Sequence, residues 1–174
     1  MSNFPFVGDT ALRGNLDKAF DYIVDLISLS ESDDFSELTK SSFRQTIIIY
    51  TSAIIEALLL HFLKSNFNEA ELVLEKWELV DIKVLYEVDA NHKIVTGHHK
   101  LKRTKRKLQK LNLDGINSIL KSKNSIAPAL CTNIDKVRDL RNDQHFGTHT
   151  SIKMYTKKDL EFVFSVAGKV KSLF

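Results

Sequence analysis

The sequence predicts a mainly all-α fold, namely a five- to six-helix up-and-down bundle with an inserted β-hairpin. Glycine and proline together supply only eight of the 174 residues, which is too few for a β-sandwich with its many turns. Apolar residues recur at three- and four-residue steps over most of the chain, as in amphipathic helices. One stretch near the middle alternates apolar and polar residues instead, which is typical of strands. The length suits a single domain covering residues 1–174.

The first helix is expected over about residues 15–30. Its apolar stripe consists of Leu16, Phe20, Ile23, Val24 and Ile27. Residues 30–34 are polar and break the pattern. Asp34 with Glu37 three residues later forms a capping pair, which predicts a long second helix reaching about Ser65.

The second predicted helix contains the most apolar part of the chain. Residues 46–63 read TIIIYTSAIIEALLLHFL. A membrane span needs about 20 predominantly apolar residues, and this run is interrupted by Glu56 and His61. We therefore expect a buried central helix and no membrane association. The charge of Glu56 in such a helix requires a cation, a hydroxyl or a backbone donor as partner.

The middle of the chain predicts a helix followed by a hairpin. A third helix is expected from Asn68 to about Trp77. Residues 80–88 then alternate apolar and polar positions, and a turn-like Asp89–His92 follows. Two such runs around a turn indicate a hairpin over about residues 79–103, within a basic insertion at about 79–106.

Helical periodicity returns after the insertion. Leu113 to Leu120 forms one amphipathic segment. Pro128 suits the first turn of the next helix, and Gly147 is expected to end it. Thr156 with Asp159 is a capping box for a C-terminal helix. The face expected to be apolar consists of Leu160, Val163, Phe164, Ala167 and Val170.

Charge is distributed unevenly along the chain. Residues 1–91 hold 7 Lys/Arg and 16 Asp/Glu, whereas residues 92–174 hold 18 and 6. The densest basic segment, from Lys93 to Lys110, has eight basic residues and no acid. Such clusters attract polyanions, although a solvated basic face explains the charge equally well. The residues expected to contact a nucleic acid are Lys100, Lys102, Arg103, Lys105, Arg106 and Lys107.

The cellular setting is predicted from what the sequence lacks. The single cysteine, Cys131, excludes an internal disulfide framework and fits a reducing compartment. The N-terminus has no secretion-signal pattern, so a cytoplasmic protein is expected. No glycine-rich phosphate loop and no cysteine pair or HExxH motif occurs, and we expect neither a cofactor nor a metal.

The segment IDKVRDLRNDQHFGTH, residues 134–149, carries the chemistry. If it is helical, Arg138, Arg141, Asn142 and His145 fall within one 100° arc at 100° per residue. RNA can be cut without metal when its 2′-hydroxyl attacks the adjacent phosphate. An imidazole can move the protons of that reaction, and a guanidinium matches the phosphate oxygens that gain charge.

This pattern resembles the HEPN superfamily. These small all-helical proteins, many of them metal-independent ribonucleases, carry an arginine, then Asn, Asp or His, and a histidine, with four to six residues between the arginine and the histidine. Arg138 and His145 fit this spacing with six residues between them, whereas Arg141 leaves only three but is followed by Asn142. The two arginines therefore remain rival or cooperating candidates. The run YTSAIIEALLLHFL, residues 50–63, is similar to the family's central helix.

The resemblance implies a homodimer in which two motif helices face each other across a cleft. His145 would exchange the proton and an arginine would hold the scissile phosphate, with Glu56 orienting that arginine. Family members act as toxins, antiphage effectors or RNA-processing nucleases, so an antitoxin or defence-system partner protein is also expected. Two alternatives stay open: a non-catalytic HEPN-like module that binds nucleic acid, a nucleotide or a protein, and a purely structural helical adaptor.

Overall fold

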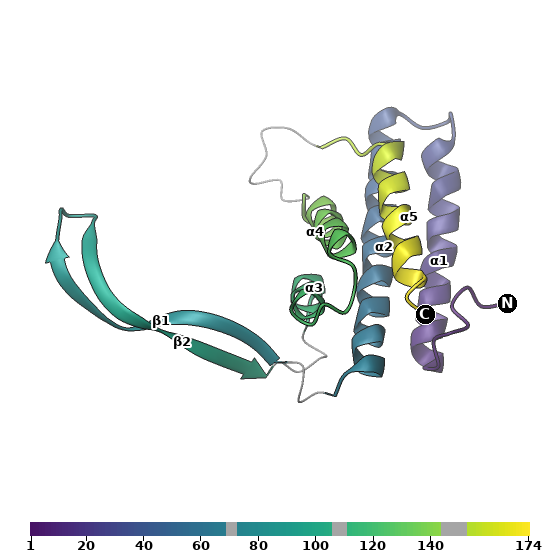
Figure 1. Cartoon of the computed structure of the whole chain (residues 1–174). Coiled ribbons are helices and arrows are strands. Elements are labelled where there is room, and N and C mark those ends of the chain that lie inside the picture. The colour runs from purple at the N-terminus through teal and green to yellow at the C-terminus, as the bar shows by residue number, and fades with distance from the viewer. Residues whose placement is uncertain (69–72, 106–110, 144–152) are drawn as a thin grey trace. The chain divides into compact units, whose positions relative to one another are not determined.

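The computed structural model describes residues 1–68, 73–105, 111–143 and 153–174, and the side chains of residues 73–76 and 103–105 lie outside this description. The described residues form five helices and one two-stranded antiparallel sheet (Figure 1). The chain is therefore mainly helical. It divides into two compact units: Met1–Asn66 with Leu111–Phe174, and Phe67–Lys110.

Helix α1 spans Thr10–Glu31. It begins before the expected residue 15 because Asp9 caps it: Asp9 Oδ1 accepts hydrogen bonds from the backbone N–H groups of Ala11 and Leu12, both at 3.0 Å. An uncapped first turn leaves its N–H groups without partners, so the capping residue fixes the start more firmly than the apolar stripe.

Helix α2 spans Glu37–Asn66. The prediction that Asp34 caps it is wrong. Ser36 Oγ accepts the Thr39 N–H at 3.2 Å, whereas Asp34 belongs to the preceding turn, where its N–H donates to Ser32 Oγ. Serine and aspartate are equally good caps. Ser36 is the cap because it directly precedes the first helical residue.

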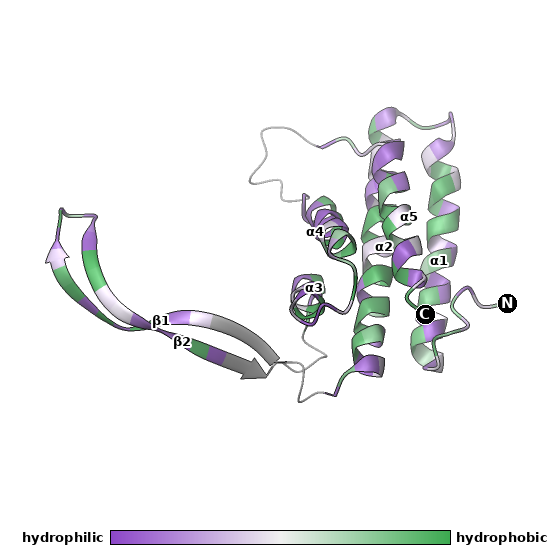
Figure 2. Ribbon diagram, viewed as in Figure 1, coloured by the Kyte–Doolittle hydropathy of each residue, from purple (hydrophilic) through white to green (hydrophobic). Residues whose placement is uncertain are grey.

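Helix α2 is the centre of the helical unit and packs against the other four described helices. Its middle is strongly hydrophobic (Figure 2), and its fully buried large side chains are Ile47, Ile48, Ile55, Leu58, Leu59 and Leu63. Within the described residues, α2 is also the one helix long and apolar enough to cross a bilayer by length and composition, and half of its most apolar window is buried inside the protein.

The second unit is a hairpin of β1, Val73–Glu87, and β2, Lys93–Lys105. The predicted helix from Asn68 to Trp77 is wrong, because Val73–Trp77 belong to β1 and pair with Lys105–Leu101. Pairing with a distant strand overrides a local preference for helix. At the predicted turn, Asp89 Oδ1 accepts the N–H groups of Asn91 and His92 at 2.8 and 2.9 Å.

A β-bulge bends the hairpin at its middle. The register shifts between Val80 and Lys83, where Asp81 has a positive φ of 53°. Opposite this point stands Gly97, and a Cβ there would lie 2.9 Å from the Val80 carbonyl oxygen. Glycine is therefore required by the close approach of the two backbones.

Three further helices complete the helical unit: α3, Leu113–Ser122; α4, Pro128–Asn142; and α5, Lys157–Lys171. Pro128 lies in the first turn of α4 as expected. The Thr156–Asp159 capping box is confirmed, with both reciprocal bonds present. The expectation that Gly147 ends α4 is wrong for the described helix: α4 ends at Asn142, and Asp143 is its C-cap, with its N–H bonded to the Asp139 carbonyl. Gly147 itself lies outside the described residues.

Candidate functional site

The candidate site is built on the last turns of α4, where Arg138 and Arg141 lie one helical turn apart. Side chains three residues apart are neighbours on a helix surface, yet these two arginines contact different helices. Arg138 reaches α3, and Arg141 reaches α2. Their electrostatic surroundings therefore differ, although the sequence treats them as equivalent.

Arg138 is surrounded by carboxylates. Its Nη1 donates to Asp114 Oδ1 of α3 and lies 3.7 Å from Asp135 Oδ1. Its Nη2 donates to Asp139 Oδ1 at 3.0 Å. The hydrogen bond to Asp139 raises the pKa of Arg138 above its usual value, against the opposing effect of burial. Three carboxylates around one guanidinium leave the immediate surroundings net negative, which disfavours a phosphate there.

Asp135 extends this cluster into a polar seam between α3 and α4. Its Oδ1 accepts from the Asn117 amide at 2.7 Å, and its Oδ2 accepts from Lys121 Nζ at 2.5 Å. Burial acts to raise the pKa of Asp135, but the hydrogen bonds from Lys121 and Asn117 outweigh it and hold the pKa below its usual value. Asn117 also donates to the Cys131 carbonyl at 2.9 Å. Arg138 is thus one member of a network that fixes α3 on α4.

Among the described residues, Arg141 has a single carboxylate partner. Its Nη1 donates to Glu56 Oε2 at 2.8 Å, and the two side chains are 27% and 28% exposed. Glu56 lies in the apolar middle of α2, so the pair satisfies an acid that would otherwise be buried without a partner. A guanidinium has five N–H donors; with one bonded to Glu56 and about a quarter of the side chain exposed, Arg141 can still donate to an anion.

The described residues on either side of positions 144–152 contact each other and the end of α4. Asn142 is exposed at the end of α4. Asp143 Oδ2 accepts from Lys153 Nζ, and the Tyr155 hydroxyl donates to the Leu140 carbonyl at 3.3 Å. Residues 143 and 153, which flank His145 in sequence, are therefore joined by an ion pair beside the end of α4.

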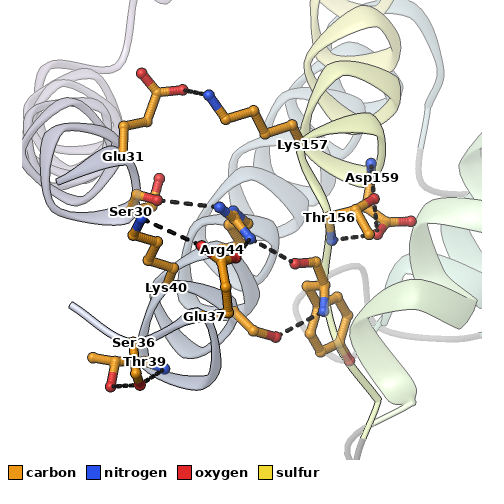
Figure 3. Close-up of polar contacts among 12 residues, drawn as sticks. Ser30, Glu31, Ser36, Glu37, Thr39, Lys40, Arg44, Thr156, Lys157 and Asp159 are labelled. Atoms are coloured by element: carbon orange, nitrogen blue, oxygen red, sulfur yellow. Dashed lines mark hydrogen bonds and ion pairs between the residues drawn. The ribbon is translucent and has the colours of Figure 1, made fainter. Parts of the chain in front are cut away.

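A buried arginine of α2 contacts the segment before α5, which contains Tyr155. Arg44 is 8% exposed, and its side chain points toward the end of α1 and the segment before α5 (Figure 3). Nη1 donates to the Tyr155 carbonyl and Nη2 to the Ser30 carbonyl, both at 3.3 Å. The Tyr155 N–H in turn donates to Ser41 Oγ at 2.7 Å. Tyr155 is 3% exposed, and burial raises the pKa of its hydroxyl.

Sequence reasoning missed Arg44 and Tyr155 as anchoring residues. The sequence does contain a signal that Arg44 is buried. Arg44 precedes the buried Ile47 and Ile48 by three and four residues, so it lies on the same face of α2. A cation on the buried face of a helix must find acceptors. The sequence holds no comparable signal that those acceptors are backbone carbonyls of Ser30 and Tyr155.

The remaining predicted site residues are placed only in part. His145 lies outside the described residues, as do Arg106 and Lys107. Arg103 and Lys105 belong to β2, and their side chains are not described. Lys102 Nζ lies 3.2 Å from Glu78 Oε2, whereas Lys100 is exposed and has no ion pair with any described side chain.

Within the described part of the chain no group of three or more His, Cys, Asp or Glu side chains is arranged to hold a metal ion. Cys131 is 2% exposed, and burial raises the pKa of its thiol, so thiolate chemistry is disfavoured there. Compared with family models, with curated proteins and with solved structures, the chain matches none of them.

Proposed function

We propose that this protein is a HEPN-like, metal-independent endoribonuclease that works as a homodimer, in the manner of a toxin or an antiphage effector. The observation that carries the proposal is the pairing of Arg141 with Glu56 in the last turn of α4. It provides a guanidinium held in one orientation and still accessible to solvent, four residues before His145.

The surroundings of the two arginines favour Arg141 as the phosphate ligand. Arg138 has carboxylates of Asp114, Asp135 and Asp139 within 4 Å, whereas Arg141 has only Glu56 among the described side chains. A phosphate that approaches Arg138 meets three like charges, and one that approaches Arg141 meets one. Arg141 also has the polar companion Asn142 next to it.

In the proposed reaction the 2′-hydroxyl of RNA attacks the adjacent phosphorus. The hydroxyl loses its proton to a base, the new P–O bond forms, and the bond to the 5′-oxygen breaks. The 5′-oxygen takes up a proton, so the products are a 2′,3′-cyclic phosphate and a 5′-hydroxyl. His145 supplies the proton transfer because imidazole titrates near neutral pH. Arg141 stabilises the negative charge that develops on the phosphate oxygens.

Glu56 is proposed as the positioning residue for Arg141. A carboxylate that accepts a guanidinium N–H restricts the rotamers of the arginine and presents its remaining donors in a fixed direction. The lysines and arginines of β2 are proposed to hold the RNA backbone. β2 contains five basic residues and no acid, although Glu78 neutralises Lys102 within the hairpin.

The test is cleavage of labelled single-stranded RNA in EDTA by the full-length protein. Wild type is expected to release fragments with cyclic-phosphate ends. His145→Ala is expected to lose about a hundredfold or more in rate, and Arg141→Ala a similar factor. Arg138→Ala is the matched control on the same helix and is expected to retain cleavage. If no RNA is cut, or if His145→Ala cuts as well as wild type, the nuclease proposal is wrong.

A second candidate function is a non-catalytic HEPN-like module that dimerises and binds nucleic acid or a protein. It is favoured by the fact that Arg138 and Arg141 both already have carboxylate partners, as structural arginines do. This candidate predicts RNA binding whose affinity falls steeply with salt and no product after long incubation. Binding by wild type and His145→Ala alike, with no cleavage by either, would decide for it.

A further inference from the structure

The helical unit contains an apolar cavity that the proposed nuclease site does not use. The cavity has a volume of about 370 Å³ and lies where α1, α2 and α5 meet. Its lining includes Phe20, Ile23 and Val24 of α1 and Ile54 and Leu58 of α2. Phe4 of the N-terminal segment, 4% exposed, also lines it.

Small residues on α5 keep this cavity open. Ala167 and Gly168 line the wall opposite α1, and a Cβ at Gly168 would meet no atom within 4 Å. Glycine inside a helix is less stable than alanine, so its presence here has a stability cost without any crowding that requires it. Phe20 and Val24 stay 37% and 47% exposed beside this space, which leaves apolar surface in contact with water.

The size of the cavity suits a small organic molecule. An apolar cavity of about 150 Å³ in a protein core binds benzene, and ligand pockets begin at about 300 Å³. At about 370 Å³ this cavity is more than twice the benzene-binding one, so it can hold a flexible hydrocarbon chain.

The polar groups of the lining indicate the head group of the ligand. They are Asn3, Thr51 and Lys171. The Thr51 hydroxyl already donates to the Ile47 carbonyl at 2.8 Å. The Lys171 ammonium lies 5.7 Å from the centre of the Phe4 ring, and it has no ion pair with a carboxylate among the described residues. An uncompensated cation beside an apolar cavity complements an anion attached to an apolar chain.

We propose that this cavity binds a free fatty acid, with the hydrocarbon chain between α1 and α5 and the carboxylate at Lys171. The chain covers the exposed parts of Phe20 and Val24, and Asn3 lies beside the carboxylate. The N-terminal segment is held in place for this contact, because the Asn3 N–H donates to Asp17 Oδ1 at 2.8 Å.

The experiment is calorimetric titration of the full-length protein with decanoate below its micelle concentration. Wild type is expected to bind one decanoate with a negative heat-capacity change, the mark of apolar burial. Gly168→Leu fills the cavity and is expected to weaken binding at least tenfold while the protein stays folded by circular dichroism. Gly14→Leu is the matched control, since Gly14 also lies in a helix with open space around its Cβ but outside the cavity, and it is expected to bind as wild type does.

The head group is tested separately. Lys171→Met is expected to weaken decanoate binding about tenfold and to leave decanol binding unchanged, with Lys169→Met in the same helical turn as control. The proposal is overturned if decanoate does not bind wild type, or if decanol binds as tightly as decanoate. It is also overturned if Gly168→Leu abolishes self-association of the protein, because the cavity then belongs to an interface between two copies.

Discussion

Replacing Arg44 by alanine tests whether a buried guanidinium holds three segments of the helical unit together. The change removes charge-assisted hydrogen bonds to the carbonyls of Ser30 and Tyr155, both 3.3 Å long. A buried acceptor left without a partner costs about 1–3 kcal/mol. Both bonds are long, and long hydrogen bonds are weak, so we expect each lost bond to cost about 1–2 kcal/mol. Nε of Arg44 is itself buried without a partner among the described atoms, so removing it recovers part of the loss.

Two unpartnered acceptors at about 1–2 kcal/mol each, less the part recovered from Nε, give an expected decrease of about 1–3 kcal/mol in the free energy of unfolding. With a urea slope of about 2 kcal/mol per molar, the midpoint falls by about 0.5–1.5 M. Urea titration followed by circular dichroism of the helices measures this shift, and cleavage or binding assays at low urea report whether the segment after α4 is affected too.

Lys40→Ala is the matched control for this variant. Lys40 and Arg44 lie on the same helix and both form an ion pair with Glu37, but among the described contacts only Arg44 donates to the carbonyls of Ser30 and Tyr155. The Lys40 side chain is 12% exposed and Glu37 is 69% exposed, so their ion pair is partly screened by salt, whereas the hydrogen bonds of Arg44 to the two carbonyls are not. The difference between the two variants is therefore expected to persist in high salt. If Arg44→Ala costs no more than Lys40→Ala, the anchoring role of Arg44 is refuted.

Three further predictions concern stability and reactivity. Folding lowers the pKa of Asp135 from 3.8. Its contribution to stability is therefore present above that pH and is lost as the pH falls toward the folded pKa. Urea midpoints measured between about pH 5 and 2 should fall less steeply for Asp135→Asn than for wild type. Gly97→Ala places a Cβ 2.9 Å from the Val80 carbonyl oxygen, so it should destabilise the hairpin by about 1–3 kcal/mol, seen as faster amide exchange in β1 and β2 and absent in Thr96→Ala. Because burial raises the pKa of Cys131, its thiol should react slowly with a disulfide reagent in the native protein and rapidly in urea; equal rates would contradict its burial.

Local features of the sequence were enough to place several elements. The Thr156–Asp159 capping box and Pro128 in the first turn of α4 are properties of a few adjacent residues. They act through backbone groups of the same turn, so no distant residue can change their effect. The run at 46–63 likewise predicted the buried central helix, because a long apolar run has to be buried in water-soluble folds, and Ile47, Ile55 and Leu59 are fully buried.

The sequence failed where another contact, distant or local, competes with the expected one. Residues 73–77 look helical by themselves, but pairing with residues 101–105 makes them a strand. The start of α2 shifted from Asp34 to Ser36 as cap, since the preceding turn uses Asp34 for its own bonds. The strand at residues 73–77 depends on a partner outside any local window, whereas the cap of α2 depends on a competing turn between Ser32 and Asp34, two residues apart.

By itself, the sequence determined which residues carry charge on α4 and that Glu56, inside an apolar helix, requires a partner. It did not determine which arginine is that partner. The tertiary structure paired Glu56 with Arg141, 85 residues away in sequence, and gave Arg138 to the carboxylates around Asp114. Helical periodicity fixes the direction of a side chain relative to its own helix axis, whereas the packing of α2 and α3 against α4 decides which opposite charge lies in that direction.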